Sequence, residues 1–76
     1  MKDKIYILDF LHSLVLAGVD HTTIGYIVVI AHQNQFKEEI DFFKYIHSKT
    51  MLNAFKDNHI IKKFSKMTLD YLTRDL

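Results

Sequence analysis

The side chains best able to do chemistry in this chain are lysines and polar amides, which gather between residues 44 and 66. Six lysines fall in this stretch, against the single acid Asp57. Lysine ammonium groups neutralise phosphate, whereas asparagine and threonine can hydrogen-bond base edges. Such a block is typical of a nucleic-acid contact, although lysines also commonly serve only to keep a helix surface in water. The candidate DNA-binding residues are Lys49, Thr50, Asn53, Lys56, Lys62, Lys63 and Lys66.

The other reactive groups are not arranged for catalysis or metal binding. None of the five histidines stands three or four residues from another, the spacing that places two ligands on one helical face. The chain has no cysteine, no glycine-rich phosphate loop and no nucleophile motif. The acids Glu38, Glu39 and Asp41 are explained by the favourable interaction of negative charge with a helix start. We therefore expect no enzyme, no metal and no cofactor.

The candidate DNA-binding residues would be positioned by two consecutive helices within residues 37–58. Apolar side chains recur at spacings of three from Ile40 onward and again up to Phe55, which favours one buried face for each helix. Ser48 can act as an N-cap, because its hydroxyl can accept a hydrogen bond from an amide one turn on. The pattern predicts a helix-turn-helix with its turn at His47-Ser48 and residues 48–58 as the recognition helix.

Two earlier helices are predicted at residues 3–17 and 20–33. The chain has no proline and only two glycines, so helix breakers are scarce. Gly18 can end the first helix in a left-handed conformation. The second run is rich in β-branched residues without clear alternation, so its assignment as a helix depends on a cap at Asp20 or Thr22.

The first predicted helix is apolar over most of its circumference. A domain of 76 residues has only a small core, so part of this apolar surface is expected to contact a second copy of the chain. The predicted homodimer interface is the stripe formed by Ile5, Leu8, Leu11 and Val15.

Residues 59–76 are compatible with two structures. Ile60 and Ile61, followed by two lysines, could begin a β-strand of a short wing. Alternatively, apolar residues recur at helical spacing from Ile60 to Tyr71. The expected fold is therefore a single, mainly α domain with a helix-turn-helix, and the β wing remains an open alternative.

No apolar run approaches the roughly 20 residues that a membrane helix needs. The start of the chain, MKDKIYILDF, is interrupted by Asp3 and Asp9 and is not followed by a small-residue cleavage site. The expectation is a soluble cytoplasmic protein without a membrane partner.

The order of these parts resembles the winged-helix repressors of the MarR-like class over about residues 22–66. The corresponding parts are TTIGYIVVIAHQ, NQF, KEEIDFFKYI, SKTMLNAFKDN and HIIKKFSK. Asn58-His59 stands where that class usually has a glycine before the hydrophobic pair, and the turn lacks the usual glycine and is about one residue short. The resemblance implies a sequence-specific regulator that binds double-stranded DNA. Its recognition helix would enter the major groove while Lys62, Lys63 and Lys66 contact phosphate.

A second function stays open beside this one. The small size, the 49% content of hydrophobic residues and a net charge of only +1 also fit a small phage or mobile-element helical protein that binds and inhibits a host protein. The wide apolar face of residues 5–16, or exposed aromatic side chains, would then be the working surface.

Overall fold

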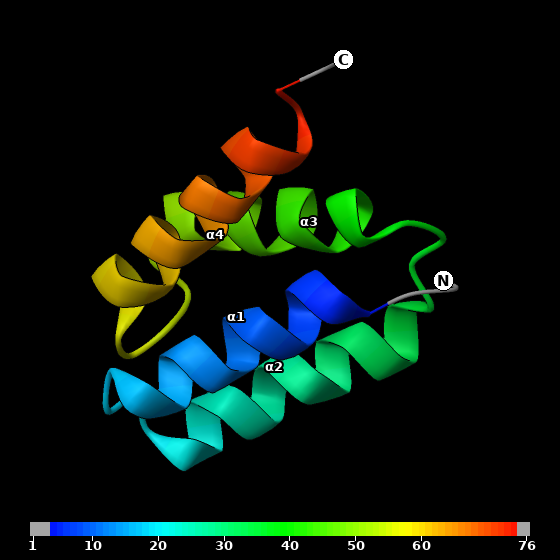
Figure 1. Cartoon of the computed structure of the whole chain (residues 1–76). Helices are drawn as coiled ribbons and strands as arrows, with labels where there is room; N and C mark the ends of the chain where they lie inside the picture. Colours follow the sequence, from blue (N-terminus) through cyan, green and yellow to red (C-terminus); the bar gives the residue numbers. More distant parts are fainter. Residues whose placement is uncertain (1–3, 75–76) are drawn as a thin grey trace.

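The computed structural model describes residues 4–74, which form four α-helices (Figure 1). Their bounds are α1 Ile5–Leu16, α2 His21–Asn34, α3 Glu39–Met51 and α4 Asn58–Leu72. The mainly α class is confirmed, and α1 and α2 begin and end within one or two residues of the predicted bounds. Residue 3 of the first predicted helix and residues 75–76 of the tail lie outside the described residues. None of the helices from residue 4 to residue 74 is both long and apolar enough to span a membrane.

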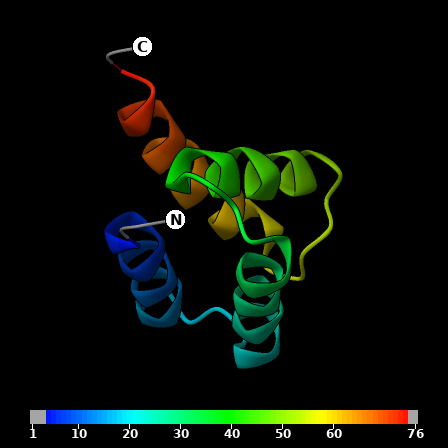
Figure 2. The same cartoon turned by 90° about the vertical axis from the view of Figure 1, so that its right-hand side faces the viewer.

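The helices are arranged as a hairpin covered by two further helices. α1 and α2 run antiparallel, Figure 2 shows them side by side, and Figure 1 shows α3 running above them along much of their length. α4 contacts both α3 and α1. On the α1 side the rings of Tyr6 and Tyr71 lie 5.7 Å apart between centroids. Hydrogen bonding with the Tyr71 phenol raises the pKa of Tyr6 above its ordinary value. α4 thus joins the hairpin to α3.

The centre of the core is aromatic. Phe42 and Phe43 are fully buried on α3, and the ring of Phe10 from α1 meets both at centroid distances of 6.1 and 5.2 Å. The three rings contact edge to face, which is a favoured geometry for aromatic pairs. Ile27 of α2 and Ile61 of α4 are also fully buried, so each helix contributes to the same core.

Several helix ends are hydrogen-bonded by side chains from elsewhere in the chain, which we call the remote caps. None of the four N-cap residues bonds its own helix through its side chain. Instead, the backbone N–H of Ile7 in the first turn of α1 donates to Glu39 Oε2 of α3 at 2.8 Å. The side-chain amide of Asn58, at the start of α4, donates through Nδ2 to the Thr50 carbonyl near the end of α3, also at 2.8 Å. These bonds satisfy backbone groups that a helix leaves open at its ends.

Another remote cap joins the start of α2 to the start of α4. The backbone N–H of Asp20, immediately before α2, donates to Asp57 Oδ2 immediately before α4, at 3.3 Å. A carboxylate at this place also interacts favourably with the positive ends of both helix dipoles.

The predicted turn at His47-Ser48 was wrong. α3 continues through both residues to Met51, and the next helix begins only at Asn58. The Ser48 hydroxyl donates to the Tyr45 carbonyl at 2.6 Å, so it is satisfied inside the helix rather than acting as an N-cap. Residues 48–58 therefore comprise the last turn of α3, a connection and the first residue of α4, and they do not form a recognition helix.

The β wing is not found either. Residues 59–66 lie within α4, and the part of the chain from residue 4 to residue 74 contains no strand. The helical alternative prevails because α4 buries one stripe that includes Ile61 and Ser65, both at 0% exposure. A strand would have sent alternate side chains to opposite faces and would have needed a partner strand.

Candidate nucleic-acid interface

Five basic side chains lie on the first nine residues of α4 and in the connection just before it, and we call them the basic surface. Lys56 precedes the helix and is exposed, and Lys62 is half-buried; the set consists of Lys56, His59, Lys62, Lys63 and Lys66. The members within α4 are spaced three or four residues apart, which makes them neighbours on a helix surface. They lie on the side opposite the buried Ile61, and the stretch from residue 59 to residue 66 covers about 10 Å of helix at 1.5 Å per residue.

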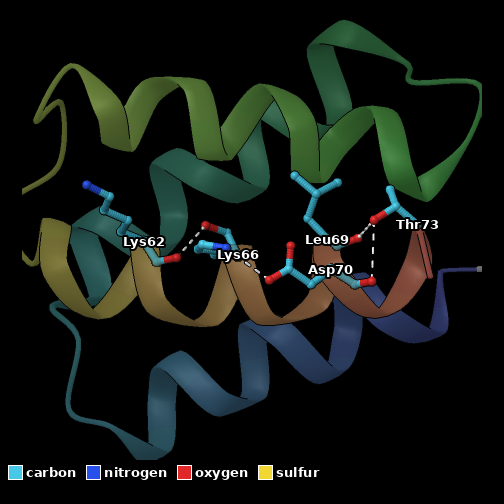
Figure 3. A network of polar contacts seen from close by, with 6 residues as sticks. Lys62, Lys66, Leu69, Asp70 and Thr73 are labelled. Carbon is cyan, nitrogen blue, oxygen red and sulfur yellow. Dashed lines mark hydrogen bonds and ion pairs between the residues drawn. The ribbon is translucent and has the colours of Figure 1, made fainter.

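Helix stability does not explain the basic surface. Lys62 and Lys63 have no acid three or four residues away, and Lys66 follows Lys62 by four positions. Like charges at this spacing destabilise a helix by about 0.2–0.5 kcal/mol. Among the described residues the one ion pair joins Lys66 Nζ to Asp70 Oδ2 at 3.0 Å (Figure 3). Because both partners are more than half exposed, this pair is screened by solvent and contributes little.

The structure separates the seven predicted DNA-binding residues. Lys62, Lys63 and Lys66 lie on α4 as part of the basic surface, and Lys56 lies in the connection before it. Lys49 is half-buried on α3, with its Nζ 5.3 Å from the centroid of the Tyr45 ring. Three of the seven thus share α4, where the sequence had left a strand and a helix as alternatives.

The structure gives no support to Thr50 as a DNA contact. Its side chain is only 2% exposed, and its hydroxyl donates to the His47 carbonyl at 2.6 Å. A buried hydroxyl whose proton is already donated to the backbone cannot reach a base edge.

Asn53 lies in the connection between α3 and α4 rather than on a helix. Its φ of 55° places it in the left-handed region, and its N–H donates to the Thr50 carbonyl at 3.0 Å. Asparagine is among the few residues that tolerate this conformation. The left-handed backbone conformation of this turn therefore explains why an asparagine stands at position 53. No contact with DNA is needed to explain it.

Substitution of Asn53 should distinguish the turn from a helix. In a turn of this conformation, Asn53→Gly should change the free energy of unfolding by less than about 0.5 kcal/mol, since glycine adopts positive φ freely. Asn53→Val should lose about 1–2 kcal/mol, since a β-branched residue is strained there. Urea denaturation of both variants measures the two losses in free energy of unfolding and shows which is larger. A helix would reverse it, because glycine is a poorer helix former than valine, and that result would contradict the turn.

Sequence reasoning missed His59 as a member of the basic surface. Its signal was the spacing of four residues to Lys63, which has meaning only once residues 58–72 are known to be helical. No group of three or more histidine or acidic side chains within residues 4–74 is arranged to hold a metal ion.

The predicted dimer interface is also only partly exposed. Ile5 and Leu8 are each 61% exposed and Val15 is 48% exposed, whereas Leu11 is half-buried and packs against the core. The stripe that faces inward on α1 is instead formed by Ile7, Phe10 and Leu14.

Comparison of the chain with protein-family models, with curated proteins and with solved structures gives no match. The candidate interface is therefore defined by the geometry and charge of its own residues.

Proposed function

We propose that this protein binds double-stranded DNA, with the basic surface at the start of α4 lying against the phosphate backbone. The observation that carries the proposal is the run of lysines on α4, in which Lys62 and Lys63 have no acid three or four residues away. Duplex DNA presents one negative charge per about 1.7 Å of its axis, so about 10 Å of helix can face several phosphates. Phosphate contact would offset the mutual repulsion of these lysines.

The low net charge of +1 is compatible with this proposal because the charges are unevenly distributed. The acid nearest in sequence to the basic surface, Asp57, accepts a hydrogen bond from the Asp20 backbone. Glu39 likewise accepts from the backbone of Ile7. Neither of these acids forms an ion pair with a lysine of the basic surface within residues 4–74.

The proposal is limited to contacts with the DNA backbone. Backbone contacts fix the position of a protein on a duplex but do not read its sequence. With residues 48–58 divided between α3, a connection and the first residue of α4, no helix at that place presents Asn53 to the major groove.

The salt dependence of binding tests the proposal. If the four lysines of the basic surface each neutralise one phosphate, the slope of log affinity against log salt should be about −3 to −4 for the natural chain. The double variant Lys62→Ala/Lys63→Ala should flatten this slope by about 2, since each lost phosphate contact changes it by about 0.9. Fluorescence anisotropy of a labelled duplex at several salt concentrations measures both.

The matched control is Lys37→Ala/Lys44→Ala, which removes the same net charge. Both lysines are exposed and lie outside the basic surface, the first in the connection before α3 and the second on α3. In Figure 1 that connection lies at the opposite end of the molecule from the start of α4. The control should retain the natural slope. Equal flattening by the two pairs, or no binding at low salt, would refute the assignment of this surface.

A further inference from the structure

α1 has an apolar face that no other helix covers. Ile5 and Leu8 are each 61% exposed, Val15 is 48% exposed and Leu16 is 75% exposed. This face lies opposite the buried stripe of the same helix, so it takes no part in the core. With the exposed His12, these five residues form what we call the outer face of α1.

The outer face has the spacing of a helix–helix seam. Ile5, Leu8, His12 and Val15 follow one another at three, four and three residues. Two helices that present such a repeat can pack side by side, with each side chain entering a hole on the other helix. The pattern extends over most of the 12 residues of α1. α2 adds Val28 and Val29, each 45% exposed, to the apolar surface of the same hairpin.

The order of residues on the outer face suits a second copy of the same helix running in the opposite direction. A two-fold axis near residue 10 places Ile5 opposite the partner's Val15 and Leu8 opposite the partner's His12. Such an interface is self-complementary, as a closed two-fold dimer requires. Sliding one helix along the other to a different register would leave some of these apolar side chains exposed to solvent.

The polar groups of the outer face are complementary as well. Asp9 borders this face and is exposed, three residues before the exposed His12. The same two-fold axis brings Asp9 close to the partner's His12, whose ring N–H can donate to the carboxylate. The contact occurs twice by symmetry. The imidazole of His12, which is exposed in the single chain, would be covered in this contact and would keep an acceptor there, which an apolar partner surface would not supply.

We propose that two copies of this chain associate through the outer faces of their α1 helices, packed antiparallel. The partner is thus a second copy of the chain rather than a different protein. This association does not depend on the binding of DNA, because the basic surface lies on α4 and not on α1.

Sedimentation equilibrium at micromolar concentrations should report about twice the chain mass of 9.0 kDa. Ile5→Glu should raise the dissociation constant by about 100-fold or more, because it places an unpaired charge against the apolar side chain of the partner's Val15. Leu52→Glu is the matched control, since Leu52 is 76% exposed but lies outside α1; it should remain a dimer. Circular dichroism checks that both variants keep their helices, which is expected for exposed positions.

Disulfide trapping tests the direction of packing. The natural chain has no cysteine, so introduced cysteines form the only disulfides. An oxidised mixture of the Ile5→Cys and Val15→Cys chains should yield mainly the mixed disulfide, because a disulfide needs Cα atoms within about 7 Å.

Three results would overturn the proposal. If the chain is a monomer across the concentration range, the outer face does not bind a second copy. A different protein, such as the target of an inhibitor, would then be its partner. Loss of the dimer in Leu52→Glu but not in Ile5→Glu would place the contact elsewhere. Predominance of the two symmetric disulfides would show parallel packing.

Discussion

Replacing Phe42 with alanine should remove about 3–5 kcal/mol from the free energy of unfolding, the range for truncating a buried phenylalanine. Phe42 is fully buried, and its ring lies 6.1 Å from Phe10, 5.8 Å from Phe36 and 5.1 Å from Phe43 between centroids. The substitution therefore leaves a cavity where α1, α3 and the connection before α3 meet. At about 0.05–0.15 kcal/mol per residue, a domain of this length has roughly 4–11 kcal/mol of stability in total. The substitution should therefore remove a large share of the total stability.

Urea denaturation followed by circular dichroism measures the loss. Leu52→Ala is the control, because it also truncates a large apolar side chain but one that is 76% exposed. Its loss should stay below about 0.5 kcal/mol. Similar losses for the two variants would show that Phe42 is not at the centre of the core.

Replacing Glu39 with alanine should cost about 1.5–3 kcal/mol, the usual contribution of a hydrogen bond to a charged group. Glu39 Oε2 accepts from the Ile7 N–H at 2.8 Å, and the pair is partly buried. The carboxylate also lies at the positive end of the α1 dipole. Glu39→Gln keeps an acceptor but removes the charge, so its loss should be smaller than that of Glu39→Ala.

Glu38→Ala provides the control for this position. Glu38 is the neighbouring residue, has the same side chain and is exposed. Its truncation should change the free energy of unfolding by less than about 0.5 kcal/mol. If denaturation shows equal losses for Glu38→Ala and Glu39→Ala, the remote cap contributes nothing and only the general charge of this segment matters.

The helices were predictable where local signals agree. Gly18 has a φ of 81° and follows the end of α1, as the sequence indicates. Between α3 and α4 the local signals mislead. Serine is a common N-cap residue, but the Ser48 hydroxyl bonds a carbonyl within α3. The true connection contains neither glycine nor proline. Its left-handed residue is Asn53, a weaker signal for a helix end than glycine.

The candidate site was predictable in composition but not in geometry. A count along the chain finds the lysines, since charge is a property of the sequence. Which lysines share a face depends on the rotation of α4 about its own axis. That rotation is set by the burial of Ile61 and Ser65. The same limit applies to α1, where apolar residues occupy most of the circumference. Its periodicity cannot tell whether Phe10 or Leu8 faces the core, because the neighbouring helices decide that.

The remote caps make the ends of the helices depend on one another. A first turn such as that of α1, close to the beginning of the described chain, would ordinarily fray by itself. Here the Ile7 N–H bonds a residue 32 positions later, and the Asp20 N–H bonds one 37 positions later. Opening either end therefore breaks contact with a different part of the chain. Slow exchange of these two amide hydrogens with solvent deuterium is the physical consequence, because their release requires the separation of elements and not just the unwinding of one turn.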